Sequence, residues 1–156
     1  MLKPAILYKE EIVRKLQESF YTDDMLYVTG SIGTWIPQIS ECPDQYTFQY
    51  AIVNDSDKLI GYMAYNVNWY DSKVYNFGLF SFDKGNAIVG KEVFEKMEEL
   101  VNNFHSIYWR AVSTNPACRS YDHFVERHGG TKHILKDYHK DKQGNYYDDI
   151  IYEIVN

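Results

Sequence analysis

The middle of the chain constrains the fold most, because it changes from a strand pattern to a helix pattern and back. Residues 74–82 (VYNFGLFSF) are apolar and aromatic, as in a buried strand, and residues 88–103 carry apolar side chains at helical spacing. Residues 106–114 (SIYWRAVST) again favour a strand. A strand, a helix and a strand in this order predict a crossover between two parallel strands of one sheet.

Antiparallel structure is predicted on both sides of this crossover, because strand-like segments there are joined by short polar turns. The other predicted elements are a helix at 7–19, a loop at 21–45, strands at 46–54 and 59–70, a helix capped by Asn115 and ended by Gly129-Gly130, and two strands around a turn at 141–145, the last beginning at 148. The predicted fold class is therefore α+β, in a single domain over residues 1–156. Its mixed sheet is mostly antiparallel, with a central β-α-β crossover and flanking helices.

The composition narrows the class of function. There are 22 Asp and Glu against 16 Lys and Arg, and phosphate neutralisation needs clustered basic residues, so no nucleic-acid partner is expected. No segment approaches the roughly 20 apolar residues of a membrane span, and the N-terminus lacks a signal-peptide pattern. Cys42 and Cys118 have no metal or redox spacing, and Asp148 and Asp149 are expected in a solvated turn. A cytoplasmic protein that binds no metal is predicted.

The loop between the central strand and its helix contains the small residues Gly85, Asn86 and Ala87. A loop of this kind often directs backbone N–H groups and the positive end of a helix dipole at a phosphate. It also occurs as a tight connection that binds nothing, and the loop alone does not decide between the two. A third interpretation remains open, in which the 15 tyrosines form a surface for an aromatic or sugar ligand.

Two segments carry a resemblance to a known family. In residues 78–93 an aromatic strand leads through the loop to Gly90 and then to Val93, which forms an apolar pair with the next residue, Phe94. In residues 115–130 the triplet Asn-Pro-Ala follows a strand, and FVERHGG ends a helix. With the order of elements over nearly the whole chain, these segments resemble the GNAT superfamily of acyl-CoA N-acyltransferases. Gly90 then aligns with the last glycine of that family's pyrophosphate-binding loop.

The resemblance implies acetyl-CoA as co-substrate and a small molecule or peptide bearing a primary amine as acceptor. It implies direct acetyl transfer in a ternary complex and allows a homodimer. The pantetheine arm is expected along the backbone of 79–82, and the pyrophosphate at the helix N-terminus over 86–91. The implied cofactor-binding residues are Leu79, Phe80, Ser81, Phe82, Gly85, Asn86, Ala87, Ile88, Val89, Gly90, Lys91 and Asn115.

The catalytic residues follow less directly. The family's proton-donating tyrosine aligns with Val125, and Tyr121, one helical turn earlier, is the nearest substitute, although it also suits a core position. No acidic residue within 74–82 corresponds to the family's base, so the base stays open. His123 and His128 belong to a residue type that often serves as an acid or base, but they are expected in solvent and at a helix end.

Two further alternatives stay open. The family's arginine or glutamine position holds Gly85 and its middle glycine is Ile88, which leaves room for a domain that binds acyl-CoA without turnover. The acceptor region is acidic, through Asp23, Asp24, Glu41 and Asp44. This charge suits a polyamine, an aminosugar or a lysine-like amine, and equally an ordinary protein surface.

Overall fold

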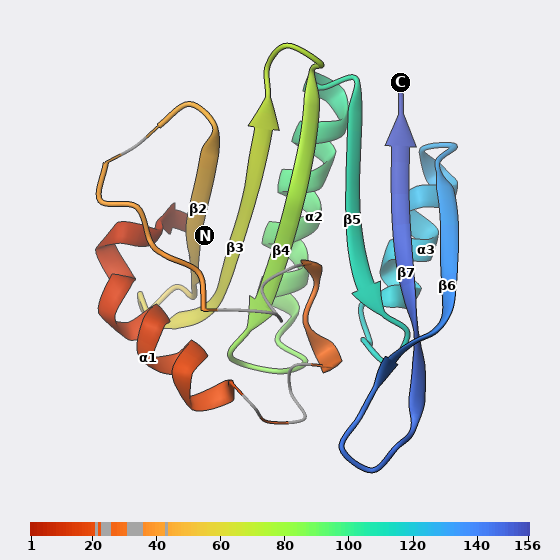
Figure 1. The fold of residues 1–156 in the computed structure, drawn as a ribbon. Helices are drawn as coiled ribbons and strands as arrows, with labels where there is room; N and C mark the ends of the chain where they lie inside the picture. The colour runs from red at the N-terminus through yellow and green to blue at the C-terminus, as the bar shows by residue number, and fades with distance from the viewer. Residues whose placement is uncertain (21, 23–25, 31–35, 43) are drawn as a thin grey trace.

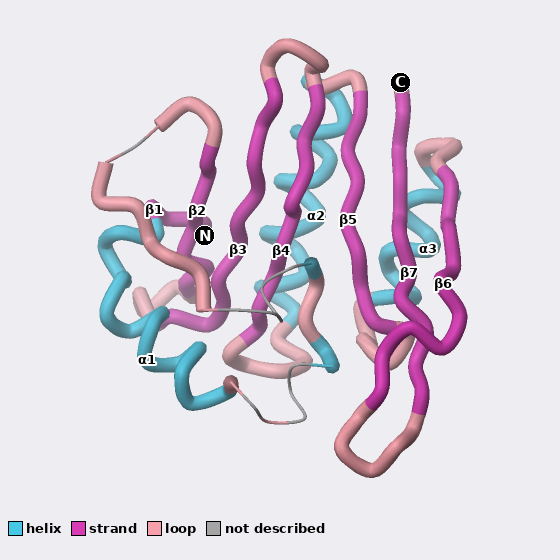
Figure 2. The backbone as a smooth tube through the Cα atoms, viewed as in Figure 1, coloured by secondary structure: helices cyan, strands magenta, loops and turns pink. Residues whose placement is uncertain are grey.

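The structure is a computed structural model that describes residues 1–20, 22, 26–30, 36–42 and 44–156, and it contains one seven-stranded sheet with helices on both faces (Figure 1). The elements, coloured by type in Figure 2, are β1 (Leu2–Pro4), the 3-10 helix η1 (Ala5–Tyr8), α1 (Lys9–Ser19), β2 (Thr47–Val53), β3 (Leu59–Asn68), β4 (Lys73–Ser81), α2 (Ala87–Asn103), β5 (Ser106–Val112), α3 (Cys118–Arg127), β6 (Thr131–Lys140) and β7 (Tyr146–Val155).

The strands lie in the order β1-β2-β3-β4-β5-β7-β6. β4 and β5 pair in parallel, and the other neighbours pair antiparallel. The helix α2 connects the parallel pair across one face of the sheet (Figure 1). The predicted α+β class, with a mostly antiparallel sheet and a central crossover, is confirmed.

Two apolar cores hold the layers together. On one face, the apolar stripes of α2 and α3 pack on β3, β4, β5 and β7 around Phe77, Trp109 and Tyr121. On the other face, Ile12 and Leu16 of α1 pack on β2, β3 and β4. The sheet is therefore buried on both sides where β4 enters the loop to α2.

β4 and β5 separate along their length. They pair from Lys73 and Ser106 as far as Phe77 and Trp109. Beyond that point Thr29 lies between them and forms bridges to Leu79 of β4 and Ala111 of β5. The predicted loop at 21–45 is therefore wrong for residue 29, which completes the sheet where the two strands diverge.

Gly30 explains why this segment can approach β4 so closely. It has a φ of 77°, and a Cβ atom there would lie 2.1 Å from the carbonyl oxygen of Phe77. An L-residue with a side chain fits neither the backbone conformation nor the space.

Other predictions need correction at the ends of elements. The third helix begins at Cys118, because the Asn115 side chain accepts a hydrogen bond from Ala117 N at 2.9 Å and closes a turn before the helix. The last strand begins at Tyr146, because Lys140 pairs with it across the hairpin. Asp149 is therefore buried within β7, where Arg110 Nε donates to it at 2.7 Å, and does not lie in a solvated turn.

Two kinds of feature are absent from the residue ranges described above. None of the helices there is long and apolar enough to cross a membrane. Nor do three or more His, Cys, Asp or Glu side chains gather there as a metal site would need.

Candidate functional site

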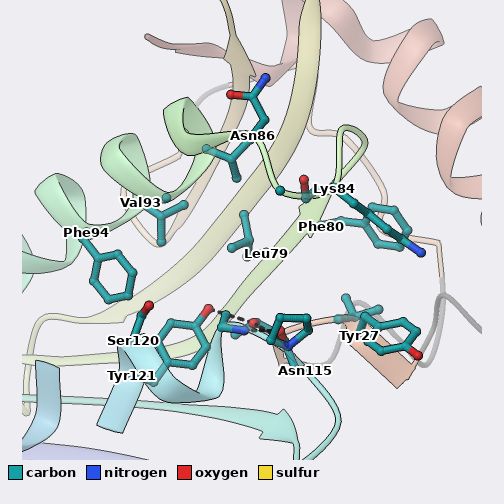
Figure 3. A pocket seen from close by; sticks show the side chains of 18 residues that line it. Tyr27, Leu79, Phe80, Lys84, Asn86, Val93, Phe94, Asn115, Ser120 and Tyr121 are labelled. Carbon is teal, nitrogen blue, oxygen red and sulfur yellow. Dashed lines mark hydrogen bonds between the residues drawn. The ribbon is translucent and has the colours of Figure 1, made fainter. Parts of the chain in front are cut away.

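A cavity of about 460 Å³ opens where β4 and β5 separate, between β4, the start of α2 and the start of α3 (Figure 3). Small-molecule sites usually span about 300–1,000 Å³. The lining residues are Tyr27, Val28, Thr29, Leu79, Phe80, Ser81, Lys84, Gly85, Asn86, Val89, Gly90, Val93, Phe94, Asn115, Pro116, Ala117, Ser120 and Tyr121. Three segments distant in sequence, around residues 28, 85 and 118, thus enclose one space.

The structure brings most of the predicted site residues to this cavity. Nine of them line it, namely Leu79, Phe80, Ser81, Gly85, Asn86, Val89, Gly90, Asn115 and Tyr121, and Phe82, Ala87, Ile88 and Lys91 do not. Phe82 packs toward α1, Ile88 packs against the core, and Ala87 is exposed. Lys91 Nζ lies 3.9 Å from Glu95 Oε1, one helical turn further along α2.

The inner end of the cavity, defined here as Thr29, Asn115 and Tyr121, is a buried hydrogen-bonded network (Figure 3). Asn115 Nδ2 donates to Thr29 Oγ1 at 3.1 Å, and Thr29 Oγ1 lies 2.8 Å from the Tyr121 hydroxyl. Thr29 is 1% exposed, Asn115 6% and Tyr121 0%, so bulk water does not satisfy the polar groups of these residues. Sequence reasoning missed Thr29, which lies in a segment without strand or helix periodicity.

Tyr121 is held in an aromatic environment that keeps it neutral. The rings of Phe94, Trp109 and Tyr152 lie 5.7, 5.6 and 5.5 Å from its own, centroid to centroid. Burial raises the pKa of the Tyr121 hydroxyl, and the hydrogen bond with Thr29 opposes that rise. A protonated phenol therefore faces the cavity at neutral pH. Val125, which aligns with the family's tyrosine, is buried in the core instead.

The edge of β4 is only partly available to a ligand. Leu79 N donates to Thr29 O at 3.0 Å, and Thr29 N donates to Leu79 O at 3.1 Å. This pairing disfavours the expected contact between the Leu79 backbone and a pantetheine arm, because both of its groups already have a partner. Alternate residues of a strand present their N–H and C=O to the same side, so Ser81 directs its backbone groups toward the same gap.

The outer end of the cavity, defined here as Lys84, Gly85 and Asn86, is the loop before α2. Gly85 has a φ of 78°, which suits a tight turn. Asn86 caps the helix, since its side chain accepts from Ile88 N at 2.9 Å, and its carbonyl accepts from Val89 N at 3.2 Å. The N–H groups of Ile88 and Val89 are therefore already paired within the segment 86–91, where the pyrophosphate is expected.

Lys84 was not among the predicted site residues. Its side chain lines the cavity, with Nζ 5.1 Å from the centre of the Tyr27 ring. The signal that points to it is its place next to Gly85, at the start of the loop expected to meet phosphate.

The cavity offers a proton donor but, within the described residues that line it, neither a carboxylate nor an imidazole. His123 is exposed, and His128 Nε2 lies 3.1 Å from Glu98 Oε2. Cys118 is buried, and desolvation raises the pKa of its thiol, which disfavours a reactive thiolate. The base is not identified at this site.

The acidic residues expected around an acceptor are engaged locally where they are described. Glu41 accepts from Lys9 Nζ at 2.6 Å, and Asp44 accepts from the backbone N–H groups of Tyr46 and Thr47. Both contacts lower the pKa of their carboxyl groups. Asp23 and Asp24 lie outside the described residues. For Glu41 and Asp44, ordinary surface roles are favoured.

No protein-family model and no curated protein matches the amino-acid sequence. Solved structures match the fold. The spermidine/spermine N-acetyltransferase SpeG of Vibrio cholerae gives a TM-score of 0.53 at 17% identity, over 72% of this chain and 66% of that chain. The Salmonella typhimurium acetyltransferase that modifies the N-terminal serine of 50S ribosomal subunit protein L7/L12 gives 0.51 at 15% identity, over 72% and 65%. A protein of Acinetobacter baylyi ADP1, provisionally described as an acetyltransferase, gives 0.63 at 14% identity, over 100% and 91%.

Identities this low show a shared fold. The chain therefore has the fold of the GNAT acetyltransferases, and the resemblance noted in the sequence is confirmed at that level. It spans somewhat less than two thirds of the length of the Vibrio and Salmonella enzymes.

Proposed function

We propose that this chain is an N-acetyltransferase of the GNAT superfamily, which binds acetyl-CoA in the cavity and transfers the acetyl group directly to a primary amine. The observation that carries the proposal is the position of the cavity. It opens where β4 and β5 diverge, beside the N-terminus of α2, and a buried neutral tyrosine faces it from α3. In a chain with this fold, these are the features that a thioester and its diphosphate require.

The residues that are present fit the chemistry of acetyl-CoA. Leu79, Val93 and Phe94 provide apolar wall for a flexible thioester arm, and Ser81 directs backbone groups into the same gap for its amides. At the outer end, the start of α2 and the side chain of Lys84 supply positive potential for phosphate groups. Acetyl-CoA supplies the activated acyl group, and the protein supplies its position.

The reaction then needs few groups from the protein. The amine nitrogen attacks the thioester carbonyl carbon and loses one proton to solvent, the C–S bond breaks, and the departing sulfur takes a proton. We assign that proton to the Tyr121 hydroxyl, because burial keeps it protonated and it lines the cavity. Holding the two reactants in register contributes much of the rate, so transfer does not require a strong base at the site.

The acceptor proposed is a small or peptide amine, and polyamines come first because the Vibrio neighbour is a spermidine/spermine enzyme. The alternative is a domain that binds acyl-CoA without turnover. It is favoured by the paired amides of Leu79 and Ile88, which reduce the contacts offered to a cofactor. A cytoplasmic location and a homodimer remain predictions.

Two measurements test this proposal in sequence. Acetyl-CoA should raise the melting temperature, since a ligand of the folded state stabilises it by mass action. Release of the CoA thiol is then followed with polyamines, aminosugars, amino acids and peptides. A thermal shift with thiol release supports the enzyme, a shift with no release across the panel supports the binding domain, and no shift with any CoA ester rejects both.

A further inference from the structure

Thr29 occupies an unusual place in the site, because its backbone joins β4 to β5 while its side chain reaches Tyr121. We infer that Thr29 is a positioning residue, which donates a hydrogen bond to the Tyr121 oxygen and thereby directs the Tyr121 hydroxyl hydrogen into the cavity. This inference rests on the proposed function, in which that hydrogen goes to the departing sulfur.

The direction of the hydrogen bonds starts from Asn115. Its Oδ1 accepts from Ala117 N at 2.9 Å, which fixes the orientation of the amide. Its Nδ2 can only donate, and it donates to Thr29 Oγ1 at 3.1 Å. One lone pair of the threonine oxygen is therefore used, and the threonine hydrogen needs an acceptor of its own.

Tyr121 is the acceptor that remains. Among the described residues, the hydroxyl of Tyr121, at 2.8 Å, is the one other hydrogen-bond partner of Thr29 Oγ1. Thr29 is 1% exposed, and a buried hydroxyl hydrogen left without an acceptor is unfavourable. With Thr29 as the donor to Tyr121, the threonine hydrogen has its acceptor and the Tyr121 hydrogen is left for a ligand in the cavity. The Tyr121 hydrogen then points away from Thr29, toward the space that its side chain lines.

The threonine is held firmly enough to maintain this direction. Both of its backbone groups are paired with Leu79, and Gly30 lies against the backbone of Phe77. These contacts fix its hydroxyl relative to the edge of β4, beside which the thioester is proposed to lie. The chain Asn115 to Thr29 to Tyr121 therefore donates in one direction, and each bond polarises the next.

The same hydrogen bond serves the reaction. When the Tyr121 O–H bond breaks and an S–H bond forms, the phenolate oxygen carries the negative charge. Thr29 already donates to that oxygen, so the charge is stabilised without rearrangement. After the products leave, a proton from solvent restores the phenol.

The kinetic test compares Thr29→Val, which removes the hydroxyl but keeps the branched shape, with Thr29→Ser, which keeps the hydroxyl. The valine variant should lower kcat about 10- to 100-fold, at or below the lower end of the roughly 10²–10⁴-fold that a proton donor supplies, and leave the acetyl-CoA Kd within about twofold. The serine variant should stay within about threefold of wild type. In a Tyr121→Phe background, Thr29→Val should have no further effect on kcat. Equal losses in the two threonine variants, or an undiminished loss in that background, would overturn the inference.

A second readout does not depend on turnover. In protein labelled at the tyrosine ¹³Cζ positions, the Tyr121 signal is assigned by its disappearance in Tyr121→Phe. We expect this signal to move in Thr29→Val and to keep its position in Thr29→Ser, because the phenol oxygen loses a donor only in the first. An unmoved signal in Thr29→Val rejects the inference even if acetyl transfer is confirmed. A moved signal in a protein that acetylates no amine supports the hydrogen bond and rejects the proposed function.

Discussion

The two ends of the cavity are built in opposite ways. At the inner end, Thr29, Asn115 and Tyr121 are buried and share one chain of hydrogen bonds. At the outer end, Lys84 and Gly85 are exposed and Asn86 is half-buried. Buried groups with fixed partners suit the reacting atoms, because their geometry does not change during the reaction. Exposed groups contribute to affinity and are screened by salt. Changes at the inner end should therefore act on turnover, and changes at the outer end on binding.

The largest effect is expected where the inner end is attached to the sheet. Gly30→Ala places a Cβ against the carbonyl oxygen of Phe77 at a φ of 77°. Overpacking and a left-handed backbone together should cost roughly 2–4 kcal/mol of unfolding free energy, measured by urea denaturation. Gly144→Ala, in the hairpin turn between β6 and β7, is the control. Gly144 has a φ of 91°, so this variant shares the backbone strain, but the atom nearest to its Cβ would be Lys140 Cε at 3.9 Å, which is an ordinary contact. Equal losses in the two variants would show that the contact between Gly30 and β4 does not matter.

Tyr121→Phe should have the next largest effect, and it separates turnover from binding. It removes the proton donor and keeps the aromatic packing against Phe94 and Trp109. We expect kcat to fall about 10²-fold while the acetyl-CoA Kd changes by less than about twofold, from steady-state kinetics and calorimetry. Unchanged turnover across the pH range would remove Tyr121 from the mechanism.

Alkaline pH should act on the inner end through stability rather than through ionisation of the folded site. Burial raises the pKa of Tyr121 and raises that of Tyr62 to about 12. A tyrosine in the unfolded chain has a pKa of about 10. The stabilisation that comes from the higher pKa of the folded state is therefore fully present below pH 10 and is lost as the pH rises further. Each such tyrosine contributes a slope of up to about 1.4 kcal/mol per pH unit above pH 10.

Urea denaturation between pH 8 and 11 measures this slope. The Tyr121→Phe variant should lose less stability above pH 10 than wild type does. Identical slopes would mean that Tyr121 ionises within the folded protein, in conflict with its burial.

The smallest effect is expected at the outer end. Lys84→Ala should raise the acetyl-CoA Kd about two- to fivefold, consistent with an exposed charge worth up to about 1 kcal/mol, and the difference should shrink in high salt. Lys91→Ala should have a smaller effect, because Lys91 does not line the cavity. Lys58→Ala, in the exposed turn before β3, controls for net charge. A larger effect at Lys91 than at Lys84 would favour the sequence-based assignment over the structural one.

The same contrast explains how much could be predicted from the sequence. The outer end is local: a strand, Gly85 and an amphipathic helix follow one another, so its pattern is readable in one segment. At the inner end, Thr29 contacts Asn115, which lies 86 positions away in the sequence, and Tyr121, which lies 92 positions away. Nothing in the sequence around Thr29 marks it as the partner of either residue. Such contacts depend on tertiary structure, which a single sequence does not display.

The errors in detail have the same origin. Asp149 looks like part of a polar turn, but pairing of β6 with β7 extends the strand and places it beside Arg110. The pairing of Leu79 with Thr29 likewise required a segment without periodicity to enter the sheet. The three α-helices and the strands from β2 to β7 were predictable, because apolar spacing encodes them directly, whereas the short elements β1 and η1 were not predicted.

The central claim is that the cavity binds acetyl-CoA, and calorimetric titration of wild type and Gly90→Leu tests it most directly. Gly90 lines the cavity, and a Cβ there would meet no atom within 4 Å, so a leucine occupies open space. Leucine also favours the helix by roughly 0.5–1 kcal/mol over glycine, which should preserve folding. We predict saturable one-to-one binding to wild type and at least tenfold weaker binding to a variant that melts at the same or a higher temperature. Absence of binding to wild type, or equal binding to both proteins, would contradict the claim.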